Sequence, residues 1–152
     1  MIFLRKPDGF DIRHQVVICL VQAAGQVLLL QRAADAADRH AGRWGMPGGT
    51  VEEFELIDAV WRELGEETGI WINKRALHQL HTLFVAYDTH DFVFTLFRLD
   101  LTHQPPVTIK REEHSAFRWV APNMALGMPL VRDQDEFLRL CCPELTGNMC
   151  QP

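Results

Sequence analysis

The segment Gly48–Ile70 constrains the fold of this chain most strongly, because it joins two adjacent glycines to an acidic stretch with helical spacing. Gly69 follows that stretch and is a typical helix stop. The apolar positions that recur at the spacing of one helix face are Leu56, Ala59, Val60 and Leu64. The segment therefore predicts a loop that turns tightly at Gly48 and Gly49 and leads into a helix with one buried face.

The predicted helix carries three glutamates within five residues, Glu63, Glu66 and Glu67. Glu63 and Glu67 are four residues apart and share a face, and Arg62 can pair with Glu66 at the same spacing. Clustered carboxylates raise one another's pKa unless a cation lies between them. Mg²⁺ prefers oxygen ligands and is often shared between carboxylates and substrate phosphates. A solvated acidic face is the alternative, but the preceding glycines favour a metal site.

These residues resemble the signature of the Nudix hydrolase family. That signature is Gly, five residues, Glu, seven residues, Arg-Glu, an aliphatic residue, any residue, Glu-Glu, any residue, Gly and an aliphatic residue. Gly49 and Glu55 match its first half, and residues 62–70 match its second half throughout. One departure is clear, because six residues instead of seven separate Glu55 from Arg62. The departure affects Glu55, which in the family supports the loop and the Arg.

The resemblance implies an α/β fold, namely an α/β/α sandwich with a mixed central β-sheet and the acidic helix across one face. It also implies a hydrolase that cleaves the pyrophosphate bond of a nucleoside diphosphate linked to another group, by attack of activated water on phosphorus. A (d)NTP or related nucleotide is the favoured substrate, although the motif does not identify it. Many members of the family form homodimers, and the oligomeric state stays open.

The expected cofactor is Mg²⁺, with Mn²⁺ as a substitute. The resemblance assigns as metal ligands the carbonyl of Gly48 and the side chains of Glu63, Glu66, Glu67 and Glu113. The catalytic group comprises the same four glutamates and Arg62, which fixes the carboxylates. Either Glu63 or Glu113 accepts the proton of the attacking water.

The stretch Arg111–Val120 supplies the second part of the expected site. Nudix proteins often carry a Glu-His and then an Arg-Trp-Val strand here, and a Glu of this loop binds metal or acts as base. Glu113 is the residue expected in this role, and Glu112 is the second choice. The alternative is that both residues belong to a solvated acidic turn. Nudix relatives that hydrolyse GDP-mannose use a His of this loop as base, and a glycosyl hydrolase using His114 is therefore an alternative function. Those relatives depart from the Arg-Glu and Glu-Glu pattern kept here, so His114 is expected to be structural or secondary.

Three residues before the glycines are candidates for substrate binding: Arg32, Arg43 and Trp44. Arg43 lies five residues before Gly48, and its guanidinium can contact a phosphate. Trp44 begins the Trp-Gly-Met-Pro-Gly-Gly stretch common in Nudix proteins, where packing or base stacking is expected.

A second alternative function is a non-catalytic nucleotide-binding module, which only the shortened spacer favours.

The length of 152 residues suits a single domain over 1–152, with an irregular lead-in at 1–13 and a frayed tail at 144–152. The net charge of −5 argues against a nucleic-acid polymer or an anionic membrane as partner. The N-terminus lacks an apolar run of signal-peptide length, and no stretch approaches the apolar length that a membrane span needs. The cysteines form no Cys-x-x-Cys pair, so free thiols and a cytoplasmic location are expected. They are Cys19, Cys141, Cys142 and Cys150.

Apolar patterns predict the remaining elements. The expected strands are 16–21 and 27–30, joined by a turn at 23–26, then 77–87, 92–101 and a short edge strand at 107–110. The expected helices after these are a short one within 122–127 and a longer one over 129–142.

Overall fold

A computed structural model of the chain describes residues 1–35 and 37–145. Within these residues the main path of the sheet is β1 (Ile2–Phe3), β6 (His78–Ala86), β7 (Asp91–Leu101), β2 (His14–Ala23), β3 (Gln26–Arg32) and β4 (Trp44–Gly45), in spatial order. Two strands branch from it: β5 (Gly48–Thr50) pairs with β2, and β8 (His114–Val120) pairs with β3. β2 and β7 are parallel and the other pairs are antiparallel, so the sheet is mixed.

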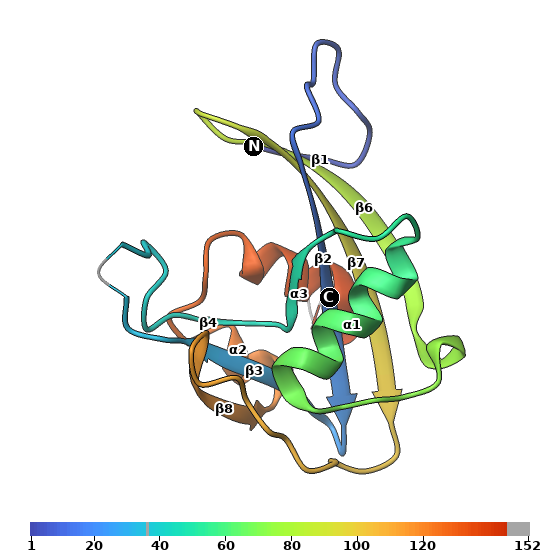
Figure 1. Cartoon of the computed structure of the whole chain (residues 1–152), viewed down its shortest axis with the longest axis vertical. Coiled ribbons are helices and arrows are strands. Elements are labelled where there is room, and N and C mark those ends of the chain that lie inside the picture. Colours follow the sequence, from blue (N-terminus) through green and yellow to red (C-terminus); the bar gives the residue numbers. More distant parts are fainter. Residues whose placement is uncertain (36, 146–152) are drawn as a thin grey trace, which may run out of the picture.

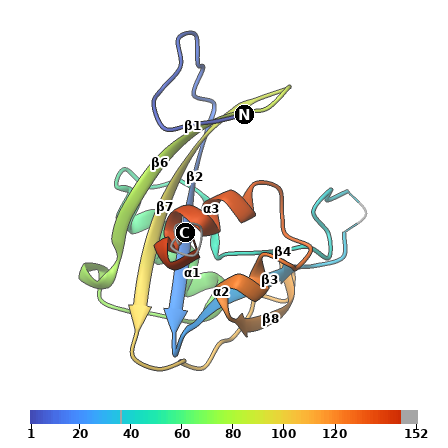
Figure 2. The same ribbon diagram turned by 180° about the vertical axis from the view of Figure 1, so that it is seen from behind.

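Helices cover both faces of this sheet. Helix α1 (Leu56–Thr68) packs on one face (Figure 1), and α2 (Pro122–Ala125) and α3 (Gln134–Cys141) pack on the other (Figure 2). Two short 3₁₀ turns, Lys74–Ala76 and Pro143–Leu145, follow α1 and α3. The arrangement confirms the predicted α/β/α sandwich. No helix among the described residues has the combined length and apolarity needed to cross a membrane.

Strands β2 and β7 form the shared wall between two apolar cores. In β2, Val17 and Cys19 face the core under α1, whereas Ile18 and Leu20 face the core under α3. The same alternation occurs in β7, where Leu96 faces the core under α3 and Phe97 faces the core under α1. A continuous apolar strand such as β2 is therefore explained by burial on both faces.

The hairpin between β2 and β3 opens soon after its turn. Ala24 and Gly25 both have positive φ, as a two-residue hairpin turn requires. β2 and β3 pair with each other at only two residue pairs next to this turn. Further along, β2 pairs with β5 at Val16–Ile18, while β3 pairs with β8 and β4. The segment that contains β4 and β5 thus crosses between the two diverging strands, and this divergence makes room for a pocket.

The structure corrects several predicted boundaries. The lead-in at 1–13 contains β1, which pairs with β6. No strand forms at 107–110, because Pro105 and Pro106 lack N–H donors and the N–H of Thr108 bonds to the carbonyl of Thr68 at the end of α1. The helix predicted over 129–142 begins only at Gln134, since residues 129–131 bond to Trp44 in extended form. Residues 146–152 of the expected tail, with Cys150, lie outside the described part.

Candidate functional site

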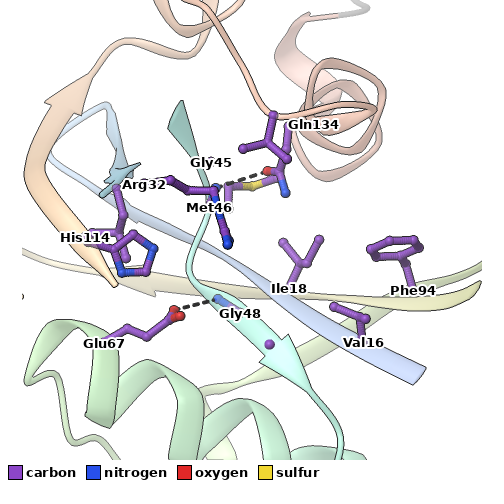
Figure 3. Close-up of a pocket in the computed structure, with 13 residues that line it drawn as sticks. Val16, Ile18, Arg32, Gly45, Met46, Gly48, Glu67, Phe94, His114 and Gln134 are labelled. Carbon is purple, nitrogen blue, oxygen red and sulfur yellow. Dashed lines mark hydrogen bonds between the residues drawn. The ribbon is translucent and has the colours of Figure 1, made fainter. Parts of the chain in front are cut away.

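A pocket of about 180 Å³ lies where β2 and β3 diverge (Figure 3). Its apolar side comes from the sheet and from the loop before α3, and its polar side comes from α1, α3, β3 and β8. The lining residues that carry polar side chains are Arg32, Glu67, His114 and Gln134. The pocket therefore places one carboxylate, one guanidinium, one imidazole and one amide beside an apolar wall.

Helix α1 delivers Glu67 to this pocket. The side chains of Ala59, Val60 and Leu64 are buried beneath the helix, which fixes its rotation on the sheet. Glu67 is 5% exposed, and its Oε2 accepts a hydrogen bond of 2.9 Å from the N–H of Gly48 (Figure 3). A buried carboxylate is thus held against the strand that carries the two glycines.

The two glycines are needed for close approach and do not form the predicted tight turn. Both lie in β5 and pair with β2. A Cβ on Gly48 would lie 2.9 Å from Cα of Ile18 and closer still to the carbonyl oxygen of Val17. A Cβ on Gly49 would lie 2.5 and 2.6 Å from the carboxylate oxygens of Glu63. Glycine therefore lets β5 fit between β2 and the acidic side of α1.

The peptide group of Gly48 faces away from β2. The neighbouring residue Pro47 accepts a bond from Cys19, and the N–H of Val51 donates to Gln15, so alternate residues of this segment face β2. Gly48 falls in the other set, and its N–H accordingly points to Glu67. The role of its carbonyl as a metal ligand stays a prediction.

Arg62 holds the acidic residues near the site that do not line the pocket. Its Nη1 lies 3.0 Å from Glu63 Oε1 and 3.1 Å from Glu66 Oε2, and its Nη2 donates to the carbonyl of Thr50 at 3.3 Å. Its Nε donates to the carboxylate of Glu53. That hydrogen bond lowers the pKa of Glu53. Arg62 therefore ties β5 and the following loop to α1, and it makes the predicted pair with Glu66.

Glu55 does not share in this network. It is exposed at the N-cap position of α1, and its side chain makes no capping hydrogen bond. With one residue fewer before Arg62, the position that the family fills with glutamate falls on the helix start, and Glu53 reaches Arg62 from the loop instead. The shortened spacer is thus compensated by a different glutamate.

The loop before β8 brings a second group of ligand-type side chains to Glu67. One ligand atom each from Glu67, Glu113 and His114 lie within 4.8 Å of one another, and they form the one such cluster in the described residues. Glu113 is exposed and its Oε1 bonds to Lys110 Nζ at 2.9 Å, whereas Glu112 is exposed and outside the cluster. Glu63 and Glu66, the other predicted ligands, are instead oriented toward Arg62.

Burial sets the electrostatics of the site. Desolvation raises the pKa of Glu67 to about 8, opposed by the N–H of Gly48 and reinforced by the charges of Glu63 and Glu113. Desolvation also raises the pKa of Glu63, opposed by Arg62. Desolvation lowers the pKa of His114. On the pocket side of α1, nearby positive charge is thus too small to offset the burial and mutual repulsion of the carboxylates.

The structure places one of the three predicted substrate-binding residues in the pocket and the other two outside it. Arg32 lines the pocket, and its Nε bonds to Asp38 at 2.6 Å. Arg43 donates to the carbonyl of Leu130, and Trp44 is buried; neither of them lines the pocket. Trp44 packs in the core under α3, which agrees with the packing interpretation.

Gln134 is a pocket residue that the sequence did not reveal. Its side chain is 8% exposed, and its Oε1 accepts a 3.0 Å hydrogen bond from the N–H of Met46. Because a backbone N–H only donates, the amide oxygen must face Met46 and leave Nε2 as the free donor. A buried glutamine in the first turn of a helix has no spacing signal that distinguishes it from a surface glutamine.

Comparisons with known proteins agree with this geometry. The family described as NUDIX domain matches residues 12–141. The protein named phosphatase NudJ from Escherichia coli (strain K12) is 30% identical over 109 residues, which are 71% of this chain and 68% of that protein.

Solved structures show the same fold. The MutT protein of Methanosarcina mazei Go1 is 26% identical, with 87% of this chain and 94% of that chain covered and a TM-score of 0.72. The NUDIX domain of Shewanella oneidensis NrtR, determined in complex with ADP ribose, is 23% identical, with 93% and 94% covered and a TM-score of 0.76. Since the family match spans most of the chain and includes its acidic helix, the chain belongs to the Nudix hydrolases.

Proposed function

We propose that this hydrolase is metal-dependent and cleaves the pyrophosphate bond of a nucleoside diphosphate linked to another group, with a (d)NTP or related nucleotide as substrate. The observation that carries the proposal is the position of Glu67. Its carboxylate is buried at the edge of a pocket, hydrogen-bonded to Gly48, and surrounded by further carboxylates and a single imidazole. Such a group is kept ionised most readily by a cation.

The residues present fit a divalent cation. Glu67, Glu113 and His114 offer ligand atoms within 4.8 Å of one another, and Nδ1 of His114 is buried without a hydrogen-bond partner. Glu63 and Glu66 lie on the same helix as further oxygen donors. Bound there, Mg²⁺ or Mn²⁺ supplies positive charge beside the phosphates and makes water a better nucleophile.

Glu63 is the favoured proton acceptor. Its side chain is 13% exposed, and a single salt bridge to Arg62 orients it. Glu113 is the alternative, but its side chain is 47% exposed and already pairs with Lys110. A largely buried carboxylate with a raised pKa is better matched to proton transfer near neutral pH than an exposed one.

Substitution of Gly49 by alanine tests this role of Glu63. The added Cβ overlaps the Glu63 carboxylate, which is the mobile end of a side chain and can rotate away, so folding is expected to persist. We expect Gly49→Ala to lower kcat by about 10²-fold, the usual contribution of a positioned base. The measurement is kcat together with the thermal midpoint. A variant with normal kcat would assign the base to another residue.

Substitution of Glu53 tests the compensation of the short spacer. Loss of the charge that holds Arg62 should disturb both carboxylates bonded to it, so we expect Glu53→Gln to lower kcat/KM by about tenfold, as for other supporting residues. Glu55→Gln is the matched control and should leave kcat/KM unchanged.

A double-mutant cycle completes the Glu53 test. Glu53→Gln and Arg62→Gln are expected to be strongly non-additive in kcat/KM, because the two side chains act through one contact. Equal effects of the Glu53 and Glu55 substitutions, or additivity with Arg62→Gln, would contradict the compensation.

The apolar side of the pocket is suited to the non-phosphate part of the substrate. Val16, Ile18 and Phe94 form a wall, and Nε2 of Gln134 is a donor beside it. Phe94 is the aromatic residue of this wall and is placed to stack on a base, whereas Phe84 packs against Phe10. Arg32 is the cation placed to contact a phosphate. A nucleotide also agrees with the ADP ribose bound by the Shewanella domain, which shares the fold.

The decisive experiment is a hydrolysis panel with Mg²⁺ and then Mn²⁺. It contains NTPs, dNTPs, oxidised dGTP, ADP-ribose, nucleotide sugars and dinucleoside polyphosphates, with products separated by ion-exchange chromatography. Metal-dependent release of a nucleoside monophosphate from one class is the expected result. Free sugar with intact nucleoside diphosphate would support the GDP-mannose-type alternative with His114. If folded protein hydrolysed none of these compounds, the result would support the non-catalytic binding module.

A further inference from the structure

His114 is buried without satisfying its ring. The residue is 7% exposed, and its Nδ1 is the one buried side-chain polar atom in the described residues that lacks a hydrogen-bond partner. Its backbone N–H donates to the carbonyl of Lys110. Any residue other than proline could make that bond, so it gives no reason for a histidine at this position. Burying a polar atom without a hydrogen-bond partner destabilises the folded protein. An apolar residue would avoid that cost, so the ring nitrogen is expected to have a partner that enters the pocket.

The surroundings of the ring indicate what that partner is. Figure 3 shows the ring of His114 directly above the carboxylate of Glu67, and the carboxylate of Glu113 completes the group. Their ligand atoms lie within 4.8 Å of one another. Two atoms bound to one ion at about 2.1 Å lie at most about 4.2 Å apart, so small side-chain rotations would close the set. Lys110 occupies only one oxygen of Glu113, and the other remains free.

We propose that His114 is a nitrogen ligand, with Glu67 and Glu113, of a divalent first-row transition metal. The inference rests on the proposed function, since it shares Glu67 with that site. Imidazole binds transition-metal ions far more tightly than it binds Mg²⁺, because Mg²⁺ prefers a shell made only of oxygen ligands. The site therefore selects Co²⁺ or Mn²⁺ over Mg²⁺, and the selectivity comes from His114. The carboxylates alone would bind Mg²⁺ equally well with or without the ring.

Pulsed EPR of bound Mn²⁺ tests the ligand directly, because a coordinated imidazole couples its nitrogen to the metal spin. The metal-free full chain is loaded with less than one equivalent of Mn²⁺. We expect nitrogen coupling in the wild type, a changed coupling pattern when the protein is made with ¹⁵N-histidine, and loss of coupling in Glu67→Gln. The isotope experiment uses the wild-type chain, so it decides the question even if a His114 variant does not fold.

Calorimetric titration tests the selectivity. We expect His114→Gln to weaken Co²⁺ binding by about tenfold or more while Mg²⁺ binding changes by less than about twofold. His103→Gln, which replaces an exposed histidine outside the cluster, is the matched control and should change neither. Bound Mn²⁺ without nitrogen coupling in the wild type would overturn the role of His114 and leave the proposed hydrolase intact. A chain that binds none of these ions and hydrolyses no nucleotide would overturn both.

Discussion

Glu67→Gln is expected to lower kcat/KM by about 10²–10³-fold with little loss of stability. A bound metal contributes several kcal/mol to stabilising charge in the transition state, and each ~1.4 kcal/mol is a tenfold change in rate. Glutamine removes the buried charge that attracts the ion but keeps an oxygen for the N–H of Gly48. The measurement is kcat/KM at saturating metal, using the substrate class identified by the hydrolysis panel. A fall of less than tenfold in folded protein would contradict the assignment of Glu67 as a ligand.

The stability of the metal-free protein provides the control for this variant. Burial raises the pKa of Glu67 from its ordinary 4.5 to about 8, so the folded chain holds a proton that the unfolded chain releases. The free energy of unfolding of the wild type should therefore fall as the pH rises from 4.5 through 8, and Glu67→Gln should lack this part of the fall. Metal should raise the thermal midpoint of the wild type but not of the variant. Equal pH profiles would contradict the burial argument.

Gly48→Ala is expected to lower the free energy of unfolding by about 3 kcal/mol, the upper end for steric overpacking. The added Cβ would overlap the carbonyl oxygen of Val17 and the Cα of Ile18, which are backbone atoms of a strand buried on both faces. β5 would have to move away from β2, and the hydrogen bond from Gly48 to Glu67 would be lost with it. Urea denaturation measures the first effect and metal affinity the second.

Gly127→Ala is the matched control for this substitution. A Cβ at Gly127 would meet only the carbonyl of Met124, at an ordinary contact distance of 3.5 Å, and Gly127 has no positive φ. The change should therefore alter the free energy of unfolding by less than about 1 kcal/mol. If both alanine variants proved equally stable, the close approach of β5 to β2 would not be the reason for glycine at position 48.

The sequence predicted the parts of the molecule whose pattern is local. The bounds of α1 follow from the spacing of Ala59, Val60 and Leu64 and from Gly69, which caps the helix in the left-handed conformation. The convergence of Glu67 with the loop residue Glu113 was implied by the family resemblance, and the cluster of ligand atoms agrees with it. The strand β2 was visible as an apolar run because two cores bury it.

Features that depend on distant partners were not predictable. Glu53 reaches Arg62 only because the loop after β5 folds back over α1, and no spacing within the loop distinguishes it from Glu52. The neighbouring sequence predicts a turn at the glycines of β5, because it does not encode their real constraint, which is the proximity of Val17 and Glu63. The late start of α3 has the same origin, since β4 draws the preceding residues into extended form.

The most direct test of the proposed chemistry is hydrolysis of the best panel substrate in H₂¹⁸O, followed by mass spectrometry of both products. If water attacks phosphorus at the Glu67 site, metal-dependent turnover places one ¹⁸O atom on a phosphate of the products, and Glu67→Gln loses this turnover. Label on the sugar carbon, with an unlabelled nucleoside diphosphate, would contradict a pyrophosphohydrolase. It would instead show the glycosyl hydrolase reaction.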